Sequence, residues 1–209
     1  MAYYFALKRV ATYTDHFTYL DGDPKKVENL DRSVDVGINP PESNLALYCG
    51  RAIDPTYLPT RLQPKGRRYK LADLIGSTTG LLASEKVRDI VEEFEPGVHA
   101  FYPVTFEWSG KSGQKDKGHF IWIIQQSIKG LHPELIEPPY PGPNEFWDGY
   151  DLYKNPDRKL VFSKEAIGNA HIWTDPQVGY QRFISDELTE AFRAAQVIGF
   201  DPQIHIEVV

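Results

Sequence analysis

Residues 180–209 read YQRFISDELTEAFRAAQVIGFDPQIHIEVV, and this stretch predicts a strand, a helix, a turn and a second strand, in that order. Apolar side chains from Leu188 to Ala195 follow the i, i+3, i+4, i+7 spacing of a helix that buries one face. Ser185 stands just before this helix, where a serine hydroxyl can accept hydrogen bonds from free backbone N–H groups. Apolar and polar residues then alternate from Ile204 to Val208, as in a half-buried strand.

An earlier stretch repeats this order. The segment 82–87 (LASEKV) matches 183–188 (FISDEL), and Ser84 takes the place of the capping serine. A second amphipathic helix is predicted over Val87–Phe94, followed by an alternating strand over Val104–Trp108. We therefore expect an α+β fold with few helices and a mixed, largely antiparallel sheet, built on a strand–helix–turn–strand unit that is used twice.

Shorter runs between turn-forming residues complete the expected sheet. Leu71–Ile75 is predicted to form a helical turn, and the wholly apolar Phe120–Ile124 is predicted to be a central strand covered on both faces. The remaining expected strands are Ala2–Lys8, Leu45–Cys49, His119–Gln125, Leu160–Phe162 and Ala170–Thr174.

The length of 209 residues fits one domain over 1–209, with 1–125 and 126–209 as its two halves.

Charge and composition narrow the class of partner. A formal net charge of −6 disfavours binding to the phosphate backbone of a nucleic acid and suits a basic protein surface instead. The segment Met1–Val10 lacks the pattern of a secretory signal, and no apolar run has the length of a membrane span. We therefore expect a soluble, cytoplasmic protein that binds neither nucleic acid nor membrane.

Candidate chemical groups are few. The six histidines do not fall at metal-ligand spacing and Cys49 is the single cysteine, so we expect no metal and no other cofactor. One interpretation makes His171 a base oriented by Asp175. The other packs His171 beside Trp173 with its ring nitrogens hydrogen-bonded. Neither capping serine lies in a nucleophile elbow, so the residues themselves predict no catalytic set.

Proline and aromatic residues gather between Glu137 and Tyr153, where acidic side chains are interleaved with the aromatic ones. A long loop of this kind is usually functional, and aromatic side chains among carboxylates suit the basic surface of a partner protein. The alternative is that these aromatic side chains fold back and close the core. The candidate partner-binding residues are Tyr140, Phe146, Trp147, Asp148, Tyr150 and Asp151.

A set of short motifs runs through the second half of the chain: Gly168-x-x-His171-Ile172-Trp173, then 183–188, then Gly199-Phe200. The earlier segment 80–87 (GLLASEKV) and the aromatic Tyr3-Tyr4-Phe5 accompany it. Together these motifs resemble a bacterial family that was first catalogued as a domain of unknown function and later grouped with the immunity proteins of polymorphic toxin systems. The resemblance covers much of the chain from residue 81 onward.

That resemblance implies a non-enzymatic protein that binds one cognate toxin and neutralises it by occlusion. It also marks His171 and Trp173 as recurring family positions without an assigned role. Two alternatives stay open at this point. One is a small, hydrolase-like enzyme that uses His171, and the other is a scaffold or regulatory module without a toxin partner.

Overall fold

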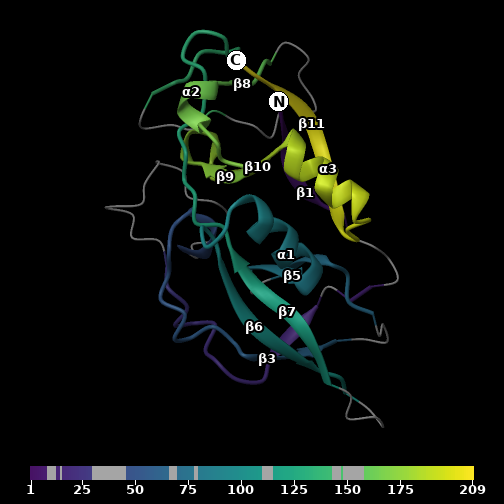
Figure 1. The fold of residues 1–209 in the computed structure, drawn as a ribbon. Helices are drawn as coiled ribbons and strands as arrows, with labels where there is room; N and C mark the ends of the chain where they lie inside the picture. Colours follow the sequence, from purple (N-terminus) through teal and green to yellow (C-terminus); the bar gives the residue numbers. More distant parts are fainter. Residues whose placement is uncertain are drawn as a thin grey trace.

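Two β-sheets and three α-helices make up the part of the chain that the computed structural model describes (Figure 1). The fold is therefore α+β with few helices and largely antiparallel pairing, as predicted from the sequence. The described residues are 1–8, 13–14, 16–29, 46–65, 70–77, 80–109, 115–142, 147 and 158–209.

The six-stranded sheet is antiparallel throughout except where β3 pairs with β6. The five-stranded sheet is antiparallel except where β8 pairs with β11. In spatial order the six-stranded sheet consists of β2 (Phe17–Tyr19), β3 (Arg61–Pro64), β6 (Ala100–Glu107), β7 (Lys115–Ile123), β5 (Gly80–Ser84) and β4 (Leu74–Ser77). The five-stranded sheet consists of β8 (Val161–Phe162), β11 (Phe200–Val208), β1 (Ala2–Leu7), β10 (Gln181–Ser185) and β9 (Ile172–Asp175).

The unit predicted twice from the sequence is present once in each sheet. In the six-stranded sheet β5 leads into α1 (Glu85–Phe94) and then β6, and in the five-stranded sheet β10 leads into α3 (Asp186–Ala194) and then β11. The two strands of each unit do not pair with each other, because an antiparallel strand lies between them. That strand is β7 in the first unit and β1 in the second. Each unit is thus a split β-α-β arrangement.

Both helices begin at the serines that the sequence indicated. The Ser84 hydroxyl accepts a hydrogen bond from the Val87 backbone N–H at 3.4 Å, and Ser185 accepts one from Leu188 at 3.2 Å. Both serines have extended backbone angles, which is the usual conformation of an N-cap residue. These contacts involve residues three positions apart, so a short stretch of sequence is enough to specify them.

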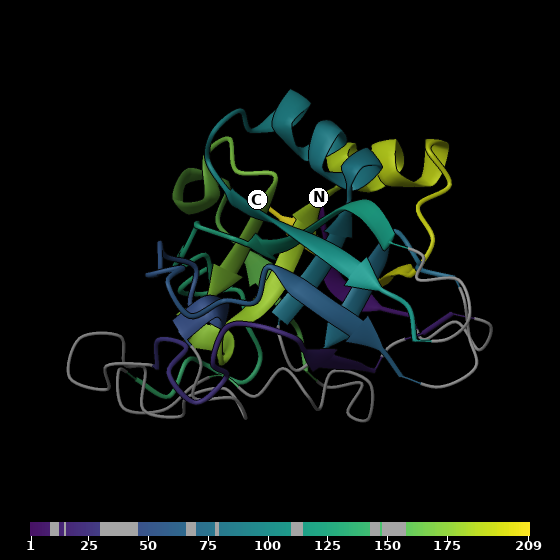
Figure 2. The same cartoon turned by 90° about the horizontal axis from the view of Figure 1, so that it is seen from below.

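The two helices lie next to each other on one side of the molecule (Figures 1 and 2). Beneath them an apolar core is formed by both sheets, and it includes Val91 of α1, Phe192 of α3, Trp122 of β7 and Ile184 of β10. Burial of each such side chain contributes roughly 1.5–3 kcal/mol to folding. This shared core joins the two sheets.

β7 is the central strand that the apolar run Phe120–Ile124 predicted. Ile121 and Ile123 pack into an apolar cluster of the six-stranded sheet, whereas Trp122 and Ile124 pack into the core shared with the five-stranded sheet. Both faces of the strand are therefore covered, which explains why its apolar residues do not alternate with polar ones.

Two local expectations were wrong. Ala46–Tyr48, within the run expected as a strand, forms a 3₁₀ helix, η1. Leu74 and Ile75, expected in a helical turn, instead open β4, which pairs with β5. Short apolar runs fit both kinds of structure, and pairing with a strand or packing against a sheet decides between them.

Two small elements complete the five-stranded part, α2 (Lys164–Ile167) and the 3₁₀ helix η3 (Pro176–Val178). Among the described residues, no helix combines the length and the apolar character that crossing a membrane requires. The organisation as one domain over 1–209 stays a prediction.

Candidate functional site

The predicted partner-binding segment enters the core at Trp147. This side chain is 1% exposed and packs in the apolar cluster on the outer side of the five-stranded sheet. Its indole N–H donates to the Pro138 carbonyl at 2.9 Å, and its backbone N–H donates to the Gln177 carbonyl at 2.6 Å. Tyr140 is half-buried against the same cluster. Trp147 thus occupies the core, the second of the two placements that the sequence allowed for these aromatic residues.

The other four candidates of this segment are Phe146, Asp148, Tyr150 and Asp151, and they lie outside the described residues. A partner-contact role for the segment therefore stays a prediction.

His171 and Trp173 contact different parts of the molecule. The His171 ring lies edge-on to Phe94 at the end of α1, and its Nδ1 is 2.9 Å from the Ser185 hydroxyl. Trp173 is buried on the outer side of the five-stranded sheet, where it packs against Phe162 and Phe183. His171 therefore connects α1 with the start of α3, whereas Trp173 fills a core.

The base and carboxylate pair considered for His171 and Asp175 is not formed in the structure. Asp175 is completely buried, and its carboxylate accepts hydrogen bonds from the backbone N–H groups of Gly130 and Gln177, both at 2.8 Å. Burial raises the pKa of Asp175 to about 7, although these hydrogen bonds act in the opposite direction. Asp175 fixes the turn into η3 and holds Gly130 beside it.

The contact between His171 and Ser185 could not be foreseen from the spacing of the two residues. Ser185 also accepts the capping hydrogen bond from Leu188, and it is only 7% exposed. The hydroxyl is thus engaged on both sides and largely covered. This environment fits an anchor between α3 and His171 better than a nucleophile, which needs access to a substrate.

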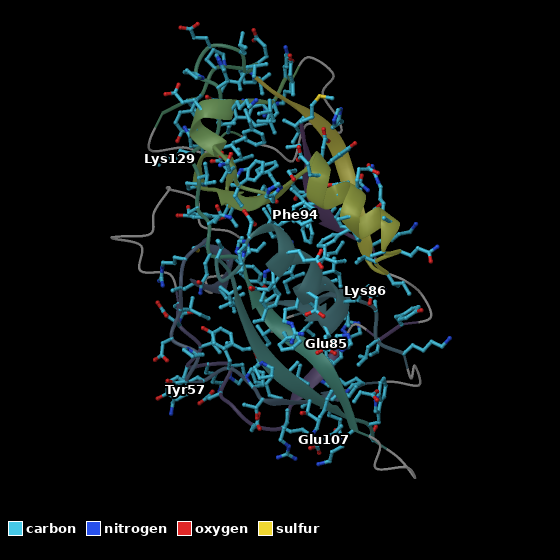
Figure 3. The ribbon with its side chains drawn as sticks, viewed as in Figure 1. Tyr57, Glu85, Lys86, Phe94, Glu107 and Lys129 are labelled. Atoms are coloured by element: carbon cyan, nitrogen blue, oxygen red, sulfur yellow. The ribbon has the colours of Figure 1, made fainter. Side chains whose placement is uncertain are left out.

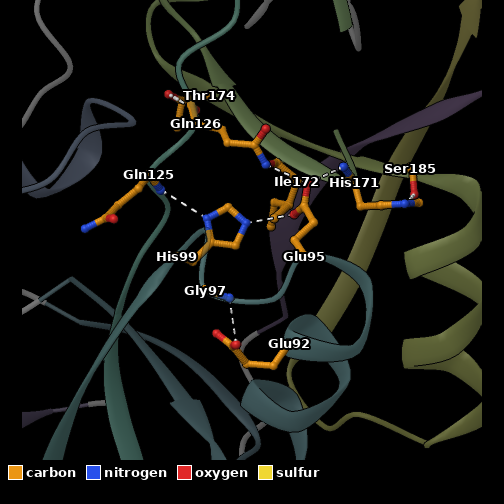
Figure 4. A network of polar contacts seen from close by, with 10 residues as sticks. All are labelled: Glu92, Glu95, Gly97, His99, Gln125, Gln126, His171, Ile172, Thr174 and Ser185. Atoms are coloured by element: carbon orange, nitrogen blue, oxygen red, sulfur yellow. Dashed lines mark hydrogen bonds and ion pairs between the residues drawn. The ribbon is translucent and has the colours of Figure 1, made fainter. Parts of the chain in front are cut away.

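A buried carboxylate, that of Glu95, is the centre of a polar network between the two sheets (Figure 4). One oxygen of Glu95 lies 2.7 Å from Nε2 of His99. The other accepts from the Gln126 side-chain amide at 2.6 Å and from the His171 backbone N–H at 2.7 Å. Burial alone would raise the pKa of Glu95, but the hydrogen bonds from His99, His171 and Gln126 outweigh it and hold this pKa below its usual value.

The hydrogen bonds of His99 fix its tautomer. The backbone N–H of Gln125 donates to Nδ1 of His99 at 3.1 Å, so Nδ1 must carry a lone pair. The ring proton is therefore on Nε2, from which it is donated to Glu95. Glu95 follows α1, Gln126 follows β7 and His171 precedes β9, so this single carboxylate connects both sheets. The i, i+4 spacing of Glu95 and His99 was visible in the sequence, but the distant partners were not.

The exposed side of α1 and α3 is strongly acidic. The two helices carry seven acidic and three basic residues, and the resulting −4 is two thirds of the −6 of the whole chain. The three basic side chains form ion pairs with neighbouring carboxylates, as Arg88 does with Glu85 and Asp89. Glu93 and Glu187 are exposed and form no ion pair within the described part of the chain. Figure 3 shows Glu85 and Lys86 at the start of α1 and Phe94 at its end. We call the exposed residues of α1 and α3 the acidic helix face.

The described residues contain no group of three or more histidine, cysteine, aspartate or glutamate side chains that could hold a metal ion.

Comparison with known proteins gives one family match: the model of an immunity protein family, Imm11, matches residues 11–204. No curated protein matches the chain.

Proposed function

The chain belongs to the immunity protein family Imm11, and on this basis we propose that it binds one cognate bacterial toxin stoichiometrically and neutralises it without catalysis. The family match over residues 11–204 carries the proposal, since it spans nearly the whole chain. Binding would occlude the active site or the substrate groove of the toxin.

The geometry of the polar groups supports inhibition by binding. Both oxygens of Glu95 are engaged by residues of the protein itself, the Asp175 carboxylate is held by backbone N–H groups, and the Ser185 hydroxyl caps α3. Each of these groups serves the fold, whereas Glu93 and Glu187 of the acidic helix face are exposed.

The acidic helix face is the surface that we propose for contact with the toxin. Complementary charge accelerates association and selects the partner, and a nuclease or another toxin that acts on an anionic substrate presents a basic groove. Because α1 and α3 lie side by side, their exposed residues lie on the same side of the molecule. The segment 137–153 remains a second candidate surface for the same partner.

The function is tested by producing the chain together with the product of the neighbouring gene. We expect the two proteins to purify as a complex of defined stoichiometry, measured by light scattering, and the chain to restore growth of cells that express that product. A neighbouring product that is toxic but neither binds the chain nor is neutralised by it would refute the proposed function.

Charge reversal on the acidic helix face tests the contact surface separately. The double substitution Glu93→Lys with Glu187→Lys is expected to slow association with the toxin by about tenfold to a hundredfold at low salt, because it replaces attraction by repulsion. The matched control is Glu134→Lys with Glu165→Lys, which changes the charge equally at exposed acidic residues away from the two helices. Stopped-flow or biolayer measurements of both variants would compare the rates.

Equal association rates for the two double variants would place the contact surface elsewhere and leave the proposed function itself intact. A strong effect of the helix variant that disappears in about 0.5 M salt would agree with steering by exposed charges.

A further inference from the structure

A pocket of about 120 Å³ lies where the two sheets and η1 meet. Its apolar wall includes Leu47, Leu81 and Ile124, which belong to three different parts of the six-stranded half. About 10–15 Å³ of such volume holds one water molecule, so the pocket accommodates a small organic molecule. Tyr48, Gln181 and Arg182 line it as well and are only half-buried, so the pocket opens to solvent on their side.

Arg182 gives this pocket its charge. The residue lies on β10, and its guanidinium is placed 5.5 Å from the centre of the Phe5 ring. No carboxylate within the described residues forms an ion pair with it. Burial lowers the pKa of Arg182, because desolvation disfavours the charged guanidinium. A partly buried cation without a counter-ion has lost part of its hydration, and an anionic ligand would compensate for that loss.

Trp122 of β7 also lines this pocket. Its side chain is only 1% exposed, and its buried indole N–H has no acceptor among the described residues. Buried N–H groups are normally hydrogen-bonded, so the indole N–H of Trp122 is a group that an acceptor on a ligand would satisfy.

We propose that this pocket binds a carboxylate carried on a short apolar stem. A carboxylate offers two coplanar oxygens to the guanidinium of Arg182, and a further lone pair to the indole N–H of Trp122. The stem lies against the apolar wall formed by Leu47, Leu81 and Ile124. The donor-rich end and the apolar wall together favour such a ligand over a fully hydrated anion or a neutral one. This site is separate from the acidic helix face and does not depend on it.

Butyrate is the probe for the carboxylate, and butyramide is its uncharged counterpart of nearly the same shape. At a butyrate concentration ten times its Kd, the equilibrium constant for unfolding should fall about elevenfold, which corresponds to about 1.4 kcal/mol and a rise in Tm of about 3–6 °C. At constant ionic strength butyramide should give no such rise. In NMR spectra one indole N–H resonance should shift with butyrate, and that resonance should be missing in Trp122→Phe.

Substitution of the arginine is the decisive comparison. Arg182→Met should abolish the saturable rise in Tm, whereas Arg193→Met should retain it. Arg193 is a matched control, because it also lies over an aromatic ring, that of Tyr3, but belongs to the exposed surface of α3. General stabilisation by salt would persist in both variants, which separates it from binding. If Arg182→Met does not fold, the comparison of butyrate with butyramide on the unchanged protein decides.

The proposal is overturned if butyrate and butyramide act alike, or if the effect of butyrate persists in Arg182→Met. The carboxylate can come from a free small molecule or from an acidic side chain of the toxin. Competition between saturating butyrate and the toxin would identify the toxin as the source, whereas independent binding would identify a free ligand. Because butyrate binding is measured on the protein alone, a failure of the proposed toxin complex would leave this test unaffected.

Discussion

Replacing Glu95 by alanine is expected to lower the free energy of unfolding by about 3–5 kcal/mol. The substitution removes the acceptor for three donors, the Nε2–H of His99, the Gln126 amide and the His171 backbone N–H. All three lie at the junction of the two sheets, where water cannot easily replace the lost acceptor. Chemical denaturation monitored by tryptophan fluorescence and by circular dichroism would measure the change.

Glu95→Gln is a sharper version of the same test. Glutamine keeps one acceptor oxygen, but its N–H₂ group would then face a donor at His99. His99 cannot reverse its tautomer, since its Nδ1 must accept from the Gln125 backbone N–H. We therefore expect Glu95→Gln to cost about 1–3 kcal/mol in spite of its similar shape. The control is Glu93→Ala on the exposed side of α1, which should change stability by less than about 0.5 kcal/mol.

The Glu95 carboxylate should make the free energy of unfolding depend on pH in the acidic range. Because its pKa is held below the ordinary glutamate value of 4.5 in the folded state, its contribution is present above pH 4.5 and is lost as the pH falls through the folded pKa. The difference in unfolding free energy between the unchanged protein and Glu95→Ala should therefore shrink below pH 4.5. A difference that stays constant down to pH 3 would contradict the ionised, hydrogen-bonded state of Glu95.

Replacing Trp147 by alanine is expected to lower the free energy of unfolding by about 3–5 kcal/mol, as for other buried aromatic residues. The indole is 1% exposed, packs in the outer core of the five-stranded sheet and donates to the Pro138 carbonyl. Trp147→Phe should cost less, since an aromatic ring remains and only the N–H contact and part of the indole volume are lost. The control is Leu135→Ala, because Leu135 is an apolar residue close in sequence that is 42% exposed.

This experiment also separates the two interpretations of the aromatic segment. A large loss of stability assigns Trp147 to the core, and any effect on toxin binding then follows from altered folding. A nearly unchanged Tm together with weakened toxin binding would instead show that Trp147 contacts the partner directly, in conflict with its burial.

Local patterns in the sequence predicted the repeated unit, and the structure confirms it. Ser84 and Ser185 cap helices through contacts three residues along the chain, and the buried faces of α1 and α3 follow from the spacing of their apolar residues. Such features depend on the geometry of one helical turn or one strand, so neighbouring residues are sufficient to specify them. The family resemblance likewise rested on short motifs of this kind, and it agrees with the match to immunity proteins.

Only the tertiary structure decided which distant segments meet. It placed β1 between β10 and β11, made β4 a strand through its pairing with β5, and put Trp147 into the core. It also brought the Glu95 carboxylate to a backbone N–H 76 residues away. The periodicity of a segment shows that one face will be buried, but it does not identify the partner on that face. Hydrogen bonds and packing across the whole chain select that partner, and with it the network at Glu95 and the pocket at Arg182.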